Sequence, residues 1–421
     1  MTRTAPAAAR AAAAAPGFRN PETLLMLMAL AMPLAFSIWM AMLNNFSENL
    51  LGFTGEDIGA IQAIREIPGL LAVLVIYVLL FLREQTLALL SLLLLGLGVA
   101  ATGFLPSFWG LALTTIISSV GFHYYEAVNQ SLQLQWLSKE RAPIVMGRLA
   151  GIGSSTAFLA FGAIFLVAHP ETQGWLGLEE PPYTALYLIG GLATAAMAVA
   201  AMALFPHFKS ETPQATRVVL KSRYWLYYTL VFLGGARRQI FVVFAAFMMV
   251  EKFDYGLSDF ALLLLINHAV NTVFSPAMGR MVARFGERPM LTLEYSGLIL
   301  VFLGYMIVDD PLTAAFLYIV NHLFFGLHFA QRTYFQKIAD PEDMAPTASV
   351  AFTINHIAAV ALPAPLGVLY LVAPSAVFGL GVGLAVASLL ASRLVPPRPQ
   401  KGDETLWRTT LAAVTPSKAT R

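Results

Sequence analysis

The sequence predicts an all-α polytopic membrane protein with twelve transmembrane helices in two pseudo-symmetric six-helix bundles. Of its 421 residues, 58% are hydrophobic and only 12% are charged, whereas a soluble domain carries about 25% charged residues. Apolar stretches of about 20 residues, long enough to span a bilayer as a helix, recur between short polar breaks. Each span must satisfy its own backbone hydrogen bonds in lipid, and the alternating ten-residue strands of a membrane barrel are missing, so helices are expected throughout.

The longest polar break, residues 206–222, follows the sixth apolar stretch and divides the chain into a first bundle over 21–205 and a second over 223–395. The flanking segments 1–20 and 396–421 are expected to be tails, and the first of them is expected to be disordered and not a signal peptide. The twelve spans are expected at residues 23–46, 57–81, 86–104, 108–133, 144–168, 183–205, 224–248, 258–280, 290–308, 312–336, 347–372 and 375–395.

The distribution of basic residues predicts the orientation in the membrane. If the N-terminus is inside, the inner loops hold nearly all of the lysines and arginines, whereas the outer loops are acidic and hold only Lys252. Cytoplasmic loops are enriched in Lys and Arg. We therefore expect an even number of spans, with both termini in the cytoplasm, in a protein of the cytoplasmic (inner) membrane.

The two halves of the chain resemble each other in sequence. "GFHYYEAVNQ" (121–130) in the fourth span matches "GLHFAQRTYF" (326–335) in the tenth, and "RAPIVMG" (141–147) matches "MAPTASV" (344–350) after a two-residue gap. Internal duplication of this kind is typical of secondary transporters, whose substrate site lies near the bilayer midplane between the repeats. We expect the two polar stretches to face one central cavity.

The loop between the eighth and ninth spans, "GRMVARFGERP" (279–289), resembles a motif of the major facilitator superfamily of secondary transporters. Ala283 stands where the family has an acid, Glu287 stands where it has an arginine, and the loop between the second and third spans (82–85) lacks the motif. The resemblance covers about 23–395. It implies two bundles that rock around a central cavity, generally in a monomer, with a gating motif formed by Gly279, Arg284, Gly286 and Arg288.

Charged residues inside a span cost roughly 2.5–3.5 kcal/mol each at a helix centre, so each needs a reason. Arg65 and Glu66 lie inside the second span. Adjacent helical residues point about 100° apart. We therefore expect both to reach the cavity only obliquely, and one to pair with another helix, either in gating or in a structural ion pair.

The fourth span carries the densest polar stretch. His123, Glu126 and Asn129 are spaced by three residues and share one helix face with Gln130. A polar stripe on an apolar helix faces protein or water and not lipid. Two interpretations remain open: these residues line a cavity, or the helix is leaving the membrane there.

The seventh span contains two adjacent arginines, Arg237 and Arg238, well inside the apolar run. Arginine presents a planar fork of donors that matches a carboxylate or phosphate. One of the two could instead form an ion pair with Glu66 or Glu126. Ion pairs are a weaker explanation for two adjacent buried arginines than for one, so binding of an anionic solute is the favoured interpretation of the pair.

Spans eight, ten and eleven add further polar residues. Through the repeat, His328 matches His123 and Gln331 matches Glu126, and Arg332 lies one turn after His328. Five of the seven histidines are expected near the core. The added residues are Asn267, His268, Asn271, Asn321, His322, His328, Gln331, Arg332, Asn355 and His356.

The balance of buried charge favours an anionic solute. Arg65, Arg237, Arg238 and Arg332 stand against Glu66 and Glu126, and an unpaired buried charge is very unfavourable, so an incoming anion would supply the partner. We predict a secondary active transporter for a small anionic or zwitterionic metabolite, in which the solute is bound by Arg237, Arg238, Arg332, Gln331, Tyr124, Asn129, Asn267 and Asn271.

Protons are the expected coupling ion. Histidine titrates near neutral pH and burial can raise the pKa of a carboxyl group into that range. The candidate pairs are Glu126 with His123 and His328 with Arg332, and Glu66 is a further candidate.

Two other cargoes remain possible at this point. Efflux of hydrophobic or cationic drugs suits the aromatic and acidic "HYYE" (123–126), and transition metals suit the core histidines. Against metal transport, the histidines lack i,i+4 spacing, cysteine is absent, and the arginines repel cations. We expect no enzymatic activity, catalytic residue, cofactor, resident metal or nucleic-acid partner, since neither a catalytic motif nor a basic stripe is present.

Overall fold

The computed structural model describes residues 17–407 except 54, 180, 210–213, 215, 216 and 256, and all named elements in this part of the chain are helical. Eleven helical stretches there are long and apolar enough to cross a membrane. The remaining predicted span, α6 (Phe108–Trp136), is as long but carries the polar stretch that includes His123 and Glu126. The predicted fold class is confirmed, and each of the twelve predicted ranges coincides with a helix or with a run of helices.

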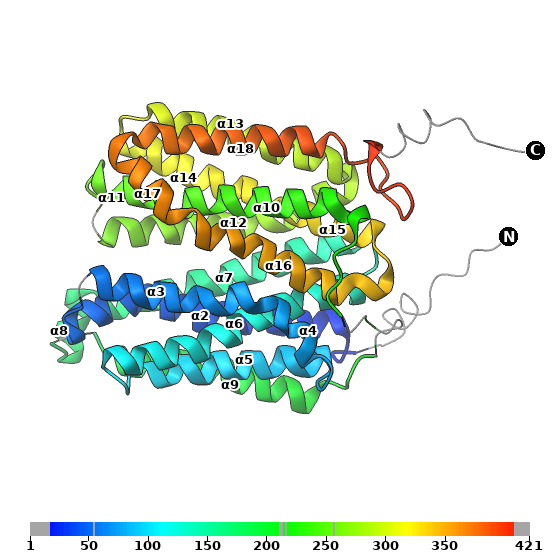
Figure 1. Cartoon of the computed structure of the whole chain (residues 1–421). Helices are drawn as coiled ribbons and strands as arrows, with labels where there is room; N and C mark the ends of the chain where they lie inside the picture. The colour runs from blue at the N-terminus through cyan, green and yellow to red at the C-terminus, as the bar shows by residue number, and fades with distance from the viewer. Residues whose placement is uncertain are drawn as a thin grey trace, which may run out of the picture.

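The first bundle forms the lower half of Figure 1. Its second span is continuous from α3 through a 3-10 turn, η1, into α4, and a short helix that was not predicted, α8, follows α7. Its elements are α2 (Pro21–Leu51), α3 (Gly55–Leu70), η1 (Leu71–Leu74), α4 (Val75–Val78), α5 (Glu84–Thr102), α6, α7 (Ala142–Ala168), α8 (Pro170–Leu176) and α9 (Tyr183–Leu204).

The second bundle forms the upper half, and three of its spans are interrupted. The seventh span passes through a π-helical turn, the tenth breaks at residues 326–328, and the eleventh breaks before Pro363. Its elements are η2 (Ser222–Tyr224), α10 (Trp225–Ile240), η3 (Phe241–Ala245), α11 (Ala246–Glu251), α12 (Leu257–Phe285), α13 (Glu287–Ile307), α14 (Pro311–Phe325), α15 (Phe329–Ile338), η4 (Pro341–Asp343), α16 (Met344–Ala361), α17 (Pro363–Val372) and α18 (Pro374–Ser392).

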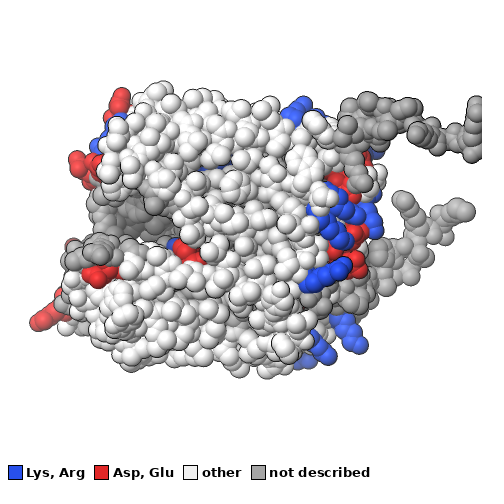
Figure 2. All heavy atoms as spheres, viewed as in Figure 1, with Lys and Arg blue, Asp and Glu red and all other residues white. Residues whose placement is uncertain are grey.

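The Lys and Arg side chains gather at one end of the molecule, with acidic residues among them, whereas the other end is mainly acidic (Figure 2). The end next to both described chain ends, at the right of the figures, is called the basic end and carries Lys139, Arg141, Lys221, Arg223, Lys337 and Lys401. The opposite end, where α8 and α11 lie, is called the acidic end and carries Glu171, Glu251, Asp254, Asp309 and Asp310. This separation matches the charge asymmetry that the sequence predicts for the loops.

The bundles are in closest contact along α7 and α12. Gly147 faces Gly279 across this seam, and a Cβ on Gly147 would lie 2.6 Å from the carbonyl oxygen of Ser275. Further along, Ser155 Oγ donates a hydrogen bond to Thr272 Oγ1 at 3.3 Å. Small residues let helix backbones approach this closely inside a membrane. Glycine at 147 is therefore required by the contact with the other bundle.

Replacing Gly147 by valine should loosen the seam between α7 and α12. Overpacking of a close contact costs typically about 1–3 kcal/mol, which should lower the midpoint of thermal unfolding of the purified protein. Gly162→Val is the matched control on the same helix, because nothing lies within 4 Å of a Cβ built there. Equal midpoints for the two variants would show that the close approach of the bundles contributes nothing to stability.

The hydrogen bonds that join the bundles in the described part of the chain gather toward the basic end. Gln336 Nε2 donates to the carbonyl oxygens of Leu134 and Leu137, both at 2.7 Å, and Lys139 Nζ donates to that of Lys337 at 3.1 Å. At the acidic end the surface is hollowed between the two halves (Figure 2). The structure is therefore closed at the basic end and open toward the acidic end.

The chain beyond α18 folds back onto the basic end instead of leaving as a tail over its described part. Glu404 is buried; its carbonyl oxygen accepts from Tyr334 Oη at 2.6 Å, and its carboxylate pairs with Arg223 at 3.3 Å. Burial acts to raise the pKa of Asp340, but hydrogen bonds from Lys401 and Lys221 outweigh it and leave this pKa below its usual value. Residues 396–407 are thus part of the second bundle, while 408–421, like 1–16, lie outside the described residues.

Candidate functional site

Arg237 and Arg238 do not act on the same surface. Arg237 is fully buried in the second bundle, where its Nη2 lies 3.7 Å from Glu294 Oε1 on α13 and its guanidinium lies 4.4 Å from the ring centre of Tyr295. Arg238 points away from this group, and its Nη2 donates to Asn355 Oδ1 on α16 at 2.9 Å. The expectation that both arginines hold the solute is therefore corrected, since consecutive residues face different neighbours on a helix.

Gln331 belongs with Arg237. Its Nε2 donates to Tyr295 Oη at 2.7 Å, and its side chain is buried between α15, α10 and α13. Arg237, Glu294, Tyr295 and Gln331 are together called the bundle-core cluster. The cluster connects three helices of the second bundle, so its geometry is that of a structural group and not of a solute-binding surface.

Arg238 and His328 reach an internal space. Both side chains have solvent-accessible surface, although many protein atoms surround each of them. The space that they contact therefore lies inside the protein, and it is called the central cavity. Arg332 and Glu126 are half-buried beside them. Glu126, on the first bundle, interacts electrostatically with Arg332 and then with Arg238, on the second, although no ion pair within 4.0 Å joins them among the described residues. Arg238 also interacts electrostatically with Glu66, which is itself paired with Arg65, so Glu126 is the acid near the two arginines that has no arginine partner of its own within 4.0 Å among the described residues.

The other predicted solute contacts lie on α6 and α12. Asn271 Nδ2 donates to the backbone oxygen of Asn267 at 2.9 Å and to its Oδ1 at 3.1 Å, so these two residues bind each other along α12. Tyr124 and Asn129 are half-buried on α6. Their participation in solute binding stays a prediction.

Arg65 and Glu66 pair with each other. Arg65 Nη2 donates to Glu66 Oε1 at 2.5 Å, and Arg65 Nε donates to the same oxygen at 3.1 Å. Glu66 Oε2 also lies 3.8 Å from His356 Nε2 on α16, in line with the expectation that one of the two residues pairs with another helix. Their mutual pairing was not predicted, because long side chains can bend back and meet despite the angle between their Cα–Cβ bonds. With Glu294 also buried, the core holds four arginines against three acids, and the surplus of positive charge falls on Arg238 and Arg332 in the central cavity.

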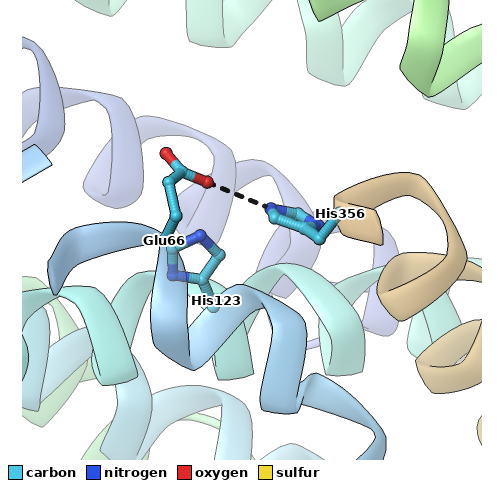
Figure 3. Close-up of side chains that lie close together, drawn as sticks. All are labelled: Glu66, His123 and His356. Atoms are coloured by element: carbon cyan, nitrogen blue, oxygen red, sulfur yellow. Dashed lines mark ion pairs between the residues drawn. The ribbon is translucent and has the colours of Figure 1, made fainter. Parts of the chain in front are cut away.

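The histidines separate into different environments. His268 stacks on Phe161 with ring centres 5.5 Å apart, and His322 Nδ1 donates to the carbonyl oxygen of Tyr318 at 2.9 Å. His123 does not pair with Glu126 as predicted; it faces α3 and α16, where it meets Glu66 and His356 (Figure 3). The sequence named His356 only as a polar residue of the eleventh span, because its neighbours come from distant parts of the chain.

The predicted gating motif lies at the basic end of α12 and α13. Gly279 contacts the backbone of Pro143 and Gly147, and Gly286 precedes α13 with φ +85°, a left-handed conformation that favours glycine. Glu287, which replaces a basic residue of the family motif, is buried and pairs with Lys337 Nζ at 2.6 Å. Arg284 is exposed and Arg288 is half-buried. The two glycines have a structural role here, and the gating role of the arginines stays a prediction.

The profile of the Major Facilitator Superfamily matches residues 24–363. The chain belongs to this superfamily. It is therefore an integral membrane transporter, a class whose members move solutes and are not enzymes in general, as the sequence predicts. The comparison with curated proteins gives no match.

Solved structures of major facilitator transporters share this fold. The E. coli fucose:proton symporter FucP in the outward conformation is 12% identical with a TM-score of 0.70, covering 89% of this chain and 98% of that one. The proton:xylose symporter XylE is 11% identical with a TM-score of 0.71, covering 91% and 97%. The human organic anion transporter MFSD10 is 12% identical with a TM-score of 0.68, covering 88% and 98%. At these identities the likeness establishes the fold alone.

Proposed function

We propose that this major facilitator is a secondary active transporter for a small anionic or zwitterionic solute. The observation that carries the proposal is the pair Arg238 and Arg332, which face the central cavity from α10 and α15. Glu126 lies near both, and the other nearby acid, Glu66, is already paired with Arg65. Arg65 and Arg237 have their own acids and do not add to this surplus. Two arginine forks converging on one space match a carboxylate or phosphate group.

We further propose that the basic end faces the cytoplasm of the inner membrane. Cytoplasmic loops are enriched in Lys and Arg, and both described chain ends lie at this end. Closure at the basic end then corresponds to an outward-open state, in which solute enters from the acidic end. Alternating access requires the contacts of Gln336 with Leu134 and Leu137, and of Lys139 with Lys337, to break. The transporting unit is proposed to be the monomer, because one chain contains both bundles.

Protons are the proposed coupling ion, and Glu126 is their proposed acceptor. When ionised, Glu126 competes with an anionic solute for Arg332 and Arg238. When protonated, it releases both arginines to the solute, so that proton and anion bind together. His328, exposed in the cavity one turn before Arg332, is a second acceptor, and Glu66 with His123 is a further proton site at the seam between the bundles.

The structure gives less support to the other cargoes. A cationic drug would meet Arg238 and Arg332, which repel it, and Glu126 alone would have to offset both. A transition-metal cargo would need converging ligands in the cavity, but His268 and His322 lie among aromatic side chains and His328 stands beside Arg332. Glu66, His123 and His356 do converge, but at the contact between the bundles, where an ion would link them and not pass through. Both cargoes are therefore disfavoured relative to an anion.

Replacing Glu126 by glutamine should uncouple transport from protons. The amide mimics the protonated acid, so we expect counterflow of the solute across proteoliposomes to persist, while accumulation driven by an imposed pH gradient is lost. Gln130→Ala, on the same face of α6, serves as the control and should remain proton-driven. Full proton-driven accumulation by Glu126→Gln would contradict the proposed coupling role. Absence of uptake for every anion tested with the wild-type protein would contradict the proposed solute class.

A further inference from the structure

Glu66, His123 and His356 bring three potential metal ligands together at the seam between the bundles (Figure 3). Glu66 is on α3 and His123 on α6 of the first bundle, whereas His356 is on α16 of the second. One ligating atom from each lies within 4.8 Å of the others, and Glu66 Oε2 lies 3.8 Å from His356 Nε2. These three residues are called the seam cluster.

The hydrogen bonds of the two histidines leave their Nε2 atoms free to bind a metal. His356 Nδ1 donates to the carbonyl oxygen of Phe352 at 2.9 Å, and His123 Nδ1 donates to that of Ser119 at 2.9 Å. The hydroxyl of Ser119 donates to the carbonyl oxygen of Arg65, so its oxygen is left as an acceptor toward His123. Both neutral rings therefore carry their proton on Nδ1. Metal-binding histidines are held in this way, with the second nitrogen bonded to a backbone carbonyl.

Gly69 makes room for the two rings. A Cβ at this position would lie 2.5 Å from His356 Cδ2 and 2.7 Å from His123 Cδ2. Any other residue at 69 would push the imidazoles apart. The first bundle thus contributes two ligands, Glu66 and His123, and the space into which His356 of the second bundle fits.

The distances fit a small cation after a modest adjustment. Nitrogen and oxygen ligands of tetrahedral zinc lie 2.0–2.2 Å from the ion, and hence about 3.4 Å from one another. The Glu66–His356 distance of 3.8 Å is already close to this value, and the two distances to His123 are at most 4.8 Å, so each would have to shorten by at most about 1.4 Å. Arg65 occupies Oε1 of Glu66 and leaves Oε2 available, while the side chain of Glu66 is 27% exposed, which provides a path for entry. A water molecule would complete four ligands.

We propose that Glu66, His123 and His356 bind a divalent transition-metal ion of the zinc type, which ties α3 and α6 to α16 and holds the basic end closed. Two imidazoles and one carboxylate are a ligand set that zinc accepts with an open fourth position. Because the ligands come from both bundles, separation of the bundles at this level would break the site. The ion acts as a reversible inhibitor and not as cargo. Metal binding does not depend on the identity of the transported solute.

The binding step is tested on the full chain in detergent, purified without a histidine tag. Titration with Co²⁺ should give the visible absorption of a tetrahedral site, and Zn²⁺ should displace it and raise the unfolding midpoint. His356→Gln and Glu66→Gln should each weaken Zn²⁺ binding by more than about tenfold. Loss of a residue that only hydrogen-bonds to a metal ligand already costs about tenfold in affinity, and loss of the ligand itself should cost more. Binding should weaken as the pH falls, because protons compete for the same lone pairs.

His268→Gln and His328→Gln are the matched controls, since both histidines lie in the membrane region but outside the seam cluster. They should bind Co²⁺ and Zn²⁺ like the wild type. Unchanged binding by folded His356→Gln, or equal loss in the control variants, would overturn the site. A monodisperse elution profile for each variant separates loss of binding from loss of folding.

The effect on conformation is tested with spin labels, for which the absence of cysteine from the chain is an advantage. Labels at Arg141→Cys on the first bundle and Glu342→Cys on the second, both exposed at the basic end, report the separation of the bundles there. Zn²⁺ should shift the distance distribution toward the short, closed form, and should not do so in the His356→Gln background. Bundles that separate equally with and without Zn²⁺, or accumulation of Zn²⁺ inside proteoliposomes, would overturn the role as a closing ion.

Discussion

Glutamine substitution of both Arg238 and Arg332 should abolish solute binding and transport while leaving a folded protein. Each arginine offers hydrogen bonds to a charged group worth about 1.5–3 kcal/mol, so the loss of two should weaken binding by about 100-fold or more. Both side chains face the central cavity, and neither belongs to the bundle-core cluster, so the unfolding midpoint should change little. Uptake into proteoliposomes and the unfolding midpoint are measured on the same preparation.

The control for this pair is Arg141→Gln. Arg141 is exposed at the basic end and pairs only with Glu22, so its loss removes a positive charge without touching the cavity. We expect wild-type uptake from the control. Wild-type uptake by the double variant would show that the two arginines do not bind the solute. The main support for an anionic solute would then be lost.

Arg237→Leu should have the opposite profile, with a large loss of stability. Removing one partner of a buried ion pair costs about 3–5 kcal/mol, because the other charge is left uncompensated. Here the remaining charge is Glu294, only 1% exposed. The unfolding midpoint in detergent, followed by tryptophan fluorescence, should fall sharply.

The double variant Arg237→Leu with Glu294→Leu should recover much of this stability, since it removes both charges at once. Recovery would identify the pair as structural. If Arg237→Leu were as stable as the wild type but failed to bind solute, the result would assign Arg237 to solute binding and would contradict a structural role for the bundle-core cluster.

The positions of the spans could be predicted from the sequence because hydropathy is a local property. Each of the twelve ranges coincides with a helical run. The interruption at residues 326–328 could not be predicted in the same way. It removes only one turn of helix and leaves the apolar pattern intact.

The site was harder to predict because it depends on how each helix is rotated. Neighbouring residues on a helix point about 100° apart, yet Arg65 and Glu66 meet, whereas Arg237 and Arg238 contact different helices. Side-chain length decided the first case and the position of Glu294 on another helix decided the second. Neither can be inferred from spacing within one span.

The seam cluster shows the same limit. Glu66, His123 and His356 come from three helices and two bundles, and nothing in the local sequence of α16 indicates that His356 faces α3. The one sequence feature that the structure explains is Gly69, which is required by the approach of the two rings. Contacts between bundles of this kind become predictable only once the packing of α3 against α16 is known.

The most direct test of the account is a ligand screen by thermal shift on the purified wild-type protein and on the Arg238→Gln, Arg332→Gln double variant. Small carboxylates and phosphorylated metabolites, cationic drugs and divalent metals are tested side by side. At least one anion is expected to raise the unfolding midpoint of the wild type and to leave that of the double variant unchanged. Stabilisation of both proteins by a cationic drug, with no response to any anion, would contradict this expectation.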